Sequence, residues 1–531
     1  MVPRWHDAAQ AAREGGVKIV TVDQMREIER RAETEHGLTS PVLMEHAGQS
    51  IAEMVWQRIT GEATSQRVLV LAGPGNNGGD GRVATRFLAR WGATVTLYAW
   101  KERQLETNGR IVAVGDDLGP VVAELRQASV VVDALLGTGH ARPLDPSMRA
   151  LLAAVEAERA RRPTLFVVAL DLPSGLNADS GAVDAGTAHA DLTITLAYPK
   201  LGLLLFPGAE YVGELEVGEI GLPPAMADDI ALEMLDAPLV RGLLPPRPLD
   251  SNKGTFGKVM LLAGSLPYPG SAYLAATAAG RVGAGLVTLA VAPEMAPVYA
   301  VKLSEATQVP LPPESGSPVE RARVFLAGLT GYAATLIGPG LGQADVTREM
   351  VLAVFDGLRT LPENERPRVV VDADGLNALA RIDRWWERLP RRSVLTPHPG
   401  EMTRLRGGAR VSGGGADRLE VAQRAAEEWG HVVVLKGACT VVAAPGEGPR
   451  ICWPPNPALA TAGTGDVLAG TVAGLLAQGA EPFTAASAAV YLHARAGLGV
   501  SARLGSAGLL ASDLLGELPI ALHDTRDGLE E

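Results

Sequence analysis

Cysteine is scarce in this chain of 531 residues, which contains only Cys439 and Cys452. Two cysteines cannot form a disulfide framework, and their spacing fits no metal cluster, so we expect two reduced thiols in a cytoplasmic protein. Positively charged residues are also fewer than negatively charged ones, with 48 Lys and Arg against 60 Asp and Glu. The formal net charge of -12 argues against a nucleic-acid-binding surface, because phosphate binding needs clustered lysine and arginine. No apolar run is long enough to span a bilayer, and Met1–Gly16 lacks the apolar core of a secretory signal, so the sequence predicts a soluble protein with no membrane partner.

A chain of this length exceeds one hydrophobic core, so we expect at least two domains. Short apolar runs alternate with helical patterns in both halves, which is typical of α/β domains whose parallel sheets are covered on both faces. Thr21 and Gln24 fit a capping box that opens one helix, and Ser40 with Pro41 opens another. The expected strands are 68–72, 94–99, 130–134, 165–171 and 192–196 in the first half, and 258–263, 286–291, 335–337, 368–372, 394–396, 432–435 and 440–443 in the second.

The segment Ala237–Leu249 holds four prolines and breaks this pattern. We interpret it as a linker, which predicts one domain over residues 1–240 and another over 241–531. The two halves share no order of motifs, so the sequence favours two unlike domains.

Three loops of the first half follow predicted strands, where ligands bind in open α/β sheets. Gly73–Gly81 contains five glycines, whose backbone amides and following helix can approach an anionic ligand closely. An ordinary tight turn would explain one or two of these glycines. Asp133 and Asp171 each end a strand; alone, either is more often a cap or turn residue than a catalyst. Oxygens of Asn77, Asp133 and Ser174 could hold a monovalent cation.

These motifs resemble the NAD(P)H-hydrate epimerases over residues 21–222. The resemblance implies a Rossmann-like three-layer domain in which Asn77, Asp133 and Ser174 bind potassium. It also implies contacts with the hydrated nicotinamide nucleotide from Asn76, Asn77, Gly78, Gly79, Asp80, Gly137, Thr138, Gly139, His140, Ala141, Arg142, Pro143 and Asp171. Epimerisation needs reversible ring opening or water loss with acid–base help, for which Asp171 is our candidate. Lys200 is a weaker candidate, and a surface lysine is the more common interpretation.

In the second half, Gly463-Thr464-Gly465-Asp466 opens a helix. Its free amides can form an anion hole for a transferring phosphoryl group, beside an aspartate able to take a hydroxyl proton. A helix-capping aspartate explains the tetrapeptide alone equally well. Lys436 ends a buried strand and could reach a nucleotide's phosphates, or extend to solvent as isolated lysines usually do. His398 lies in a proline-rich loop, and His493 is expected to be a satisfied core histidine.

Together these motifs resemble the ribokinase-like domain of ADP- or ATP-dependent NAD(P)H-hydrate dehydratases, over residues 251–518. The matching motifs are Asn252–Gly257, Ala263–Ser265, Tyr268–Gly270, Arg281–Gly285, Gly338–Gly342, His398–Glu401, Lys436–Thr440 and Gly463–Asp466. Ser271 replaces an expected alanine. The resemblance implies hydrate contacts from Ala272, Gly340, His398 and Asp466, with Asp466 as catalytic base. It implies adenine-nucleotide contacts from Lys436, Gly437, Ala438, Cys439, Thr440 and Gly465, with Mg²⁺ bridging the phosphates and Glu401 as an indirect aid.

The resemblance therefore predicts a cytoplasmic, homo-oligomeric enzyme that epimerises the R and S hydrates of NADH and NADPH. It also dehydrates the S hydrate, with conversion of ADP to AMP and phosphate; ATP is the other candidate donor. Two alternatives stay open. The second half could be a small-alcohol kinase, because fold and anion hole do not choose the acceptor, and the first half could be a non-catalytic nucleotide-binding module. A nicotinamide dehydrogenase is disfavoured, because no Gly-x-Gly-x-x-Gly motif appears in the expected context.

Overall fold

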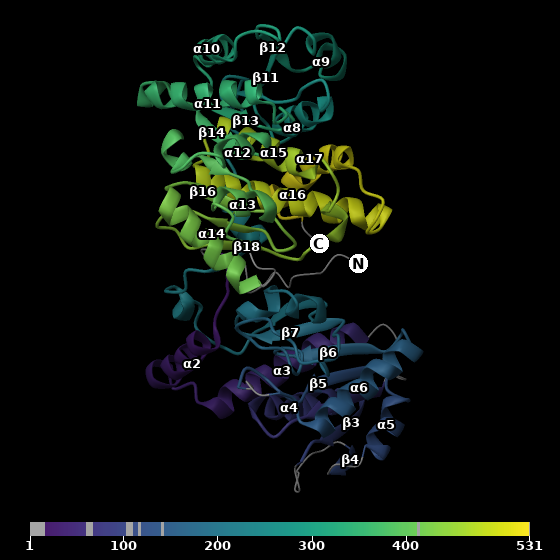
Figure 1. Cartoon of the computed structure of the whole chain (residues 1–531). Helices are drawn as coiled ribbons and strands as arrows, with labels where there is room; N and C mark the ends of the chain where they lie inside the picture. The colour runs from purple at the N-terminus through teal and green to yellow at the C-terminus, as the bar shows by residue number, and fades with distance from the viewer. Residues whose placement is uncertain are drawn as a thin grey trace. The chain divides into compact units, whose positions relative to one another are not determined.

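The computed structural model describes residues 16–59, 67–101, 110–114, 118–139, 143–410 and 415–529 (Figure 1). The described residues between 17 and 231 form one compact unit, and those between 232 and 412 and between 417 and 531 form a second. We call them the N-terminal and C-terminal units. No helix of the described residues is long and apolar enough to cross a membrane.

The N-terminal unit is built on a seven-stranded parallel sheet with the order β4-β3-β2-β5-β6-β7-β8. Its strands are β2 (Arg67–Ala72), β3 (Thr94–Ala99), β4 (Arg110–Val114), β5 (Val130–Ala134), β6 (Phe166–Leu170), β7 (Leu192–Leu196) and β8 (Glu214–Gly218). Its helices are α2 (Val22–His36), α3 (Ser40–Ile59), α4 (Asn76–Arg90), α5 (Gly119–Leu125) and α6 (Pro146–Arg161). The predicted capping box is present, because the Thr21 hydroxyl accepts from the amide of Gln24 and the Gln24 side chain accepts from the amide of Thr21.

Alternate side chains of the strands pack on opposite faces of this sheet. Val68 and Val70 of β2 join a core with α2, α3 and α4, while Leu69 and Leu71 join a second core with α5 and α6. This period of two places helices on both faces, as the near-continuous apolar strands predict. The Rossmann-like three-layer fold is therefore confirmed for this unit.

The strand order also sets where a ligand can bind. From β2 the chain adds β3 and β4 on one side and β5 to β8 on the other. The carboxyl ends of β2 and β5 flank this switch point, and open α/β sheets bind ligands there. The loops after β2, β5 and β6 consequently meet at one edge of the sheet.

The C-terminal unit contains strands in the order β9-β18-β17-β16-β15-β14-β13-β10-β11-β12. Pairing is parallel from β12 through β16, antiparallel among β16, β17 and β18, and parallel between β18 and β9. The strands are β9 (Glu233–Leu235), β10 (Lys258–Leu262), β11 (Leu286–Val291), β12 (Thr307–Pro310), β13 (Ala334–Ile337), β14 (Arg368–Val371), β15 (Val394–Leu395), β16 (Val432–Leu435), β17 (Val441–Ala443) and β18 (Arg450–Cys452). This mixed sheet agrees with the predicted ribokinase-like domain.

Helices α8, α15, α16 and α17 share one large apolar core with this sheet. The helices of the unit are α7 (Ala237–Leu243), α8 (Pro269–Arg281), α9 (Ala296–Lys302), α10 (Pro318–Gly328), α11 (Asp345–Thr360), α12 (Asp374–Leu379), α13 (Pro399–Leu405), α14 (Gly415–Trp429), α15 (Thr464–Ala477), α16 (Pro482–Leu504) and α17 (Leu514–Asp527). Helix α15 contacts α8, α16 and the central strands β13 and β14, which holds its N-terminus at the carboxyl edge of the sheet.

The interpretation of Ala237–Leu249 as a linker is wrong for its first half. Residues 237–243 form α7, which packs against α16 and α17. The Asp236 side chain accepts from the amide of Leu239 and caps this helix at 3.0 Å, while Pro238 occupies the first turn, where a missing N–H costs nothing. The units divide at residues 231/232, earlier than the sequence placed the boundary, because β9 already pairs with β18.

Two candidate active sites

A cavity of about 660 Å³ lies over the switch point of the N-terminal unit. Helices α2 and α3 and the segments after β2, β5, β6 and β7 line it. The sequence-predicted residues along this cavity are Asn76, Asn77, Asp80, Gly137, Thr138, Gly139 and Asp171. Gly78, Gly79 and Pro143 are not part of the lining, and His140, Ala141 and Arg142 fall outside the described residues.

Two glycines of the Gly73–Gly81 loop have a packing role. A Cβ at Gly73 would overlap the carbonyl oxygen of Leu135, and a Cβ at Gly78 would overlap that of Gly73. The loops after β2 and β5 therefore touch through their backbones, with no side chain between them. The sequence argument assigned these glycines to a ligand, whereas the structure shows that the chain itself approaches them closely.

Asp133 and Ser174 form a closed pair beneath the cavity. Ser174 donates its hydroxyl to Oδ1 of Asp133 at 2.7 Å and its amide to Oδ2 at 2.9 Å. Burial raises the pKa of Asp133, which these bonds and the Leu135 amide partly offset. The side chain of Asn77 is held beside this pair, because its Nδ2 donates to the carbonyls of Leu136, after β5, at 2.8 Å and of Leu170, at the end of β6, at 3.1 Å. Leu136 in turn donates its amide to the Ser174 hydroxyl at 3.0 Å.

The interpretation of Lys200 as a surface lysine is wrong. Its side chain is 2 % exposed and pairs with Asp171 at 2.5 Å. Its ammonium also donates to the Thr195 hydroxyl at 3.3 Å and to the Leu196 carbonyl at 2.8 Å. Asp171 itself has a φ of 66°, in the left-handed region that Asp tolerates better than most residues. The backbone turn at the end of β6 and the Lys200 pair together fix this carboxylate at the cavity wall.

Asp80, in the second turn of α4, is another carboxyl group that lines this cavity, together with Glu29 and Glu33 of α2. It is 7 % exposed. Burial raises the pKa of Asp80 to about 8, and the nearby charges of Asp171 and Glu29 raise it further, against a smaller opposing effect of Lys200. Two carboxyl groups of one cavity thus sit in unlike surroundings.

In the C-terminal unit, Gly463 adopts a φ of 93° and opens α15. The Thr464 hydroxyl donates to the carbonyls of Leu459 and Thr461 at 2.9 Å each, which fixes the turn. Asp466 lies in the first turn of α15, beside amides that have no partner within the helix. Burial, and then the charge of Asp372, raise the pKa of Asp466 to about 6. The arrangement suits a group that takes up a proton near neutral pH.

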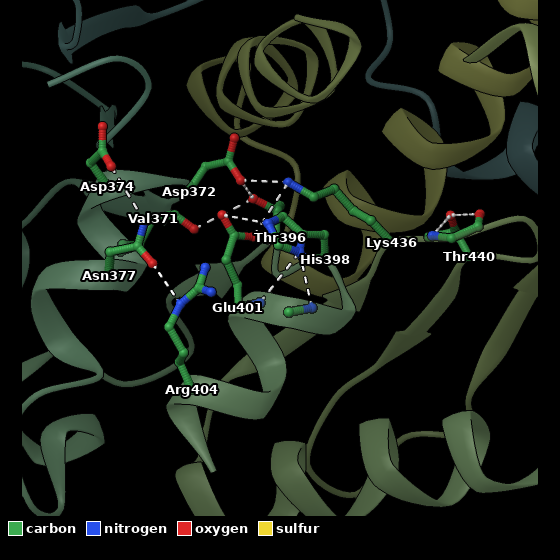
Figure 2. A network of polar contacts seen from close by, with 12 residues as sticks. Val371, Asp372, Asp374, Asn377, Thr396, His398, Glu401, Arg404, Lys436 and Thr440 are labelled. Carbon is green, nitrogen blue, oxygen red and sulfur yellow. Dashed lines mark hydrogen bonds and ion pairs between the residues drawn. The ribbon is translucent and has the colours of Figure 1, made fainter. Parts of the chain in front are cut away.

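Figure 2 shows the charged network beside this turn. Lys436, after β16, donates to Oδ1 of Asp372 at 2.7 Å and lies 3.9 Å from Glu401. Although burial alone would lower it, the pKa of Lys436 is raised by Asp372 and Glu401. Thr396 also donates to Asp372 Oδ1 at 2.7 Å. Lys436 is therefore a mostly buried, paired cation, with 18 % of its side chain exposed, rather than one that extends to solvent.

Sequence reasoning did not assign a role to Asp372, which is 1 % exposed. The available signal was its place at the end of the predicted strand 368–372, the same signal that singled out Asp133 and Asp171. Burial raises the pKa of the neighbouring Glu401 to about 6, against the lowering effect of Lys436.

His398 is the N-cap of α13, and its ring accepts hydrogen bonds. Nδ1 accepts from the amides of Gly400 at 3.0 Å and Glu401 at 3.3 Å, while Glu401 Oε2 accepts from the His398 amide at 2.8 Å. Burial, then Lys436 and Arg404, lower the pKa of His398. A neutral ring with an accepting Nδ1 carries its proton on Nε2, which lies 3.4 Å from Oε1 of Glu401.

The structure brings the remaining predicted residues of this unit close to Asp466 and Lys436. Ser271, next to Ala272, hydrogen-bonds Asp466, and a Cβ at Gly340 would lie 2.7 Å from that of Ser271. A Cβ at Gly465 would lie 3.4 Å from Nζ of Lys436. Gly437 and Thr440 close a turn in which the Thr440 hydroxyl donates to the Gly437 carbonyl at 3.0 Å.

Three further predicted positions show no polar side chain free for a ligand or for catalysis. Ala438 is exposed on the turn after β16. Burial raises the pKa of Cys439 to about 12, which keeps its thiol neutral. His493 is buried with Nε2 3.0 Å from the Thr464 carbonyl, and burial lowers its pKa to about 4. It is the satisfied core histidine that the sequence predicts.

Residues 259–519 match the family described as NAD(P)H-hydrate dehydratase, and residues 40–202 match the YjeF-related protein N-terminus. The bifunctional NAD(P)H-hydrate repair enzyme Nnr of Moorella thermoacetica is 38 % identical over 96 % of this chain and 98 % of its own length. The enzyme of the same name from Salinibacter ruber is 38 % identical over 94 % and 95 %. A crystal structure of the ADP/ATP-dependent NAD(P)H-hydrate dehydratase from Bacillus subtilis is 33 % identical, with a TM-score of 0.45, over 55 % of this chain and 98 % of that chain.

Proposed function

Because the chain belongs to the bifunctional NAD(P)H-hydrate repair enzymes, we propose that its epimerase chemistry takes place at Asp171 and its dehydratase chemistry at Asp466. The matches to relatives over nearly the whole length of both chains carry the family assignment. The enzyme therefore combines an NAD(P)H-hydrate epimerase with an ADP/ATP-dependent NAD(P)H-hydrate dehydratase. The sequence-based prediction of this activity is confirmed. The residue roles below are our proposals.

In the epimerase site, Asp171 is the proposed proton acceptor. Its Oδ1 accepts from Lys200 at 2.5 Å, from the Leu196 amide at 3.2 Å and from the Thr195 hydroxyl at 3.4 Å. Among the described residues nothing bonds to Oδ2, so this oxygen remains for a proton of the hydrate. Inversion at the hydroxyl-bearing carbon needs such a group, whether the ring opens or water leaves.

We further propose that Asn77, Asp133 and Ser174 hold K⁺. Oδ1 of Asn77 is buried without a hydrogen-bond partner. A bound cation would supply the partner that this oxygen lacks. Asp133 is a buried carboxyl with no cationic side chain bound to it among the described residues. The ion would supply positive charge at the meeting point of the loops after β2, β5 and β6. Replacing K⁺ by Li⁺, whose smaller radius fits this oxygen set poorly, should slow epimerisation and leave dehydration unchanged.

In the dehydratase site, we propose that Asp466 takes the proton of the hydrate's hydroxyl as that oxygen attacks the terminal phosphoryl group of ADP. The amides opening α15 face the developing charge. Lys436, held next to Gly465 and fixed by Asp372, would neutralise the nucleotide's phosphates. Phosphate then leaves from the ring carbon, and loss of a proton from the adjacent carbon restores the dihydropyridine. His398, with its Nε2–H, would donate to the hydrate, and Ala272 and Gly340 would contact it.

Mg²⁺ is proposed to accompany the nucleotide. The described residues contain no group of three His, Cys, Asp or Glu that could hold a metal ion. The ion would therefore be held mainly by the phosphates, where it neutralises their charge. The preference for ADP over ATP, the cytoplasmic location and a homo-oligomeric state remain predictions from the sequence. No observation favours the small-alcohol kinase.

The test follows recovery of reduced-nicotinamide absorbance from a mixture of both epimers with Mg²⁺ and ADP, then with ATP. Full recovery, abolished by Asp466→Asn and retained by the exposed control Asp383→Asn, would support both activities. Recovery that stops at the share of one epimer would contradict the epimerase proposal. No recovery with either donor would contradict the whole assignment and favour a kinase.

A further inference from the structure

The epimerase cavity contains a carboxyl group that finds no partner. Asp80 lines the cavity and is more than nine-tenths buried. Among the residues that the structure describes, none donates a hydrogen bond to its carboxyl group or forms an ion pair with it. Burying a carboxylate without donors or a counter-ion is costly, and the group lowers that cost by holding a proton. The geometry thus favours the neutral form of Asp80.

Lys200, the cation whose charge opposes the rise in the pKa of Asp80, donates its protons to other groups. An ammonium group has three protons to donate. The acceptors of Lys200 are Asp171 Oδ1, the Thr195 hydroxyl and the Leu196 carbonyl. These acceptors use all three protons, so Lys200 has none left for Asp80. The contacts that direct Lys200 to Asp171 therefore leave Asp80 without a cationic partner.

The charged groups around Asp80, taken together, also favour its protonated form. Asp171 at the end of β6 and Glu29 on α2 bring negative charge toward it, and Lys200 after β7 only partly opposes them. Together with burial, these charges raise the pKa of Asp80 to about 8. Of the four carboxyl groups that line the cavity, Asp80 therefore favours its protonated form, whereas Asp171 is paired with an ammonium. A carboxyl group that favours its proton and faces one paired with a cation is the arrangement expected of an acid and a base acting together.

We propose that Asp80 is the proton donor of the epimerase site and works opposite Asp171, the proton acceptor. This inference rests on the proposed epimerase function. It assigns a second catalytic residue to the reaction, on a different element of the fold from the first.

The protons balance in either route to inversion. In ring opening, Asp171 takes the hydroxyl proton, the carbon–oxygen bond becomes a carbonyl, the bond from that carbon to the ring nitrogen breaks, and the nitrogen receives the proton of Asp80. Rotation of the aldehyde and the reverse steps return both protons. In water loss, Asp80 protonates the departing hydroxyl, the nitrogen lone pair forms the iminium ion, and water adds to the other face as its proton returns to the enzyme.

The test uses the full chain without nucleotide, so that the dehydratase is idle, and follows interconversion of the separated epimers by chromatography. Asp80→Asn keeps the shape of the side chain and removes its proton, and should lower kcat by about 10²-fold or more. Asp80→Glu keeps a protonatable carboxyl and should retain more activity than Asp80→Asn. The matched control is Asp23→Asn, a carboxyl on α2 that is 93 % exposed and should leave the rate unchanged.

Two further measurements separate the possible failures. The wild-type rate should fall as the pH rises through about 8, and Asp80→Asn should lose this limb; a purely structural role for Asp80 would not move it. The infrared difference spectrum between wild type and Asp80→Asn at pH 7 should contain the carbonyl band of a protonated carboxyl. If wild type interconverts the epimers and Asp80→Asn stays within about threefold of it, far from the loss expected of a general acid, the proposal is overturned and the epimerase stands. If wild type is inactive, the epimerase proposal fails, and the infrared band alone decides the state of Asp80. If the band of a protonated carboxyl is absent, the proposal is overturned.

Discussion

The substitution Asp372→Asn measures how much one negative charge contributes to the stability of the C-terminal unit. The amide oxygen can still accept the Thr396 hydroxyl, so the change removes the counter-charge of Lys436 and little else. Lys436 is mostly buried, with 18 % of its side chain exposed, between Asp372 at 2.7 Å and Glu401 at 3.9 Å. After the substitution the more distant Glu401 and the charge of Asp466 remain near the ammonium.

The expected loss in the free energy of unfolding depends on whether Lys436 keeps or loses its proton in the variant. Breaking a buried ion pair costs about 3–5 kcal/mol. The ammonium can avoid that cost by losing its proton, at about 1.4 kcal/mol for each pH unit below an ordinary lysine pKa of about 10.4. This sets a ceiling of about 4.6 kcal/mol at pH 7 and about 1.9 kcal/mol at pH 9. Because Glu401 remains, we expect a loss in the free energy of unfolding of about 2–4 kcal/mol at pH 7 and less than about 2 kcal/mol at pH 9.

Proton linkage fixes the direction in which the stability of each protein changes with pH. In the wild type the raised pKa of Lys436 contributes stability that is fully present below the unfolded pKa and is lost only as the pH rises through the folded value. In the variant, the unfolded state binds the proton more tightly than the folded state, so its stability rises between pH 7 and 9. The two proteins therefore converge as the pH increases.

Urea unfolding followed by tryptophan fluorescence measures this difference. The clustered side chains of Trp385, Trp386 and Trp429 report on the C-terminal unit. The exposed control Asp383→Asn should change the free energy of unfolding by less than about 0.5 kcal/mol. A loss at pH 7 below about 1 kcal/mol, or an equal loss at both pH values, would refute the reasoning, because a buried unpaired ammonium requires both a cost and its pH dependence.

Three other substitutions test separate parts of the structure. Asp466→Asn should reduce ADP-dependent dehydration by about 10²–10⁴-fold, and the wild-type rate should rise with pH through about 6 as this carboxyl loses its proton; a rate flat over that range would contradict the role. Gly73→Ala should lower the free energy of unfolding by about 1–3 kcal/mol in denaturant titrations, since its Cβ would meet the Leu135 carbonyl; an unchanged midpoint would show that the loops can separate. Lys200→Met should cost about 3–5 kcal/mol by calorimetry, with most of it recovered when Asp171→Asn is added, and a neutral single variant would mean that the pair contributes nothing.

Local patterns were enough to predict much of the fold. The apolar runs end where their strands end to within one residue, and the Thr21 capping box starts α2. Such features depend on residues close together in the chain, so periodicity and capping preferences specify them. The ordered motifs also identified the family, which the comparisons confirm over most of the chain.

Other features depend on partners distant in sequence, and local patterns could not predict them. Lys200 is buried because it meets Asp171, 29 positions earlier, and Lys436 because it meets Asp372, 64 positions earlier. The proline-rich segment forms α7 because Asp236 caps it and α16 and α17 cover it. The edge strand β12, half exposed along its length, shows little of the apolar pattern that marks a buried strand.

The left-handed backbone at Asp171 limits what this position can become. Most side chains are strained at a φ of 66°, whereas Asp, Asn and Gly tolerate it. The replacements that the fold accepts most readily are therefore the ones that remove the carboxylate. These replacements suit the backbone but leave the buried ammonium of Lys200 without its counter-charge, so we expect a loss of epimerisation that arises here to come with a lower free energy of unfolding.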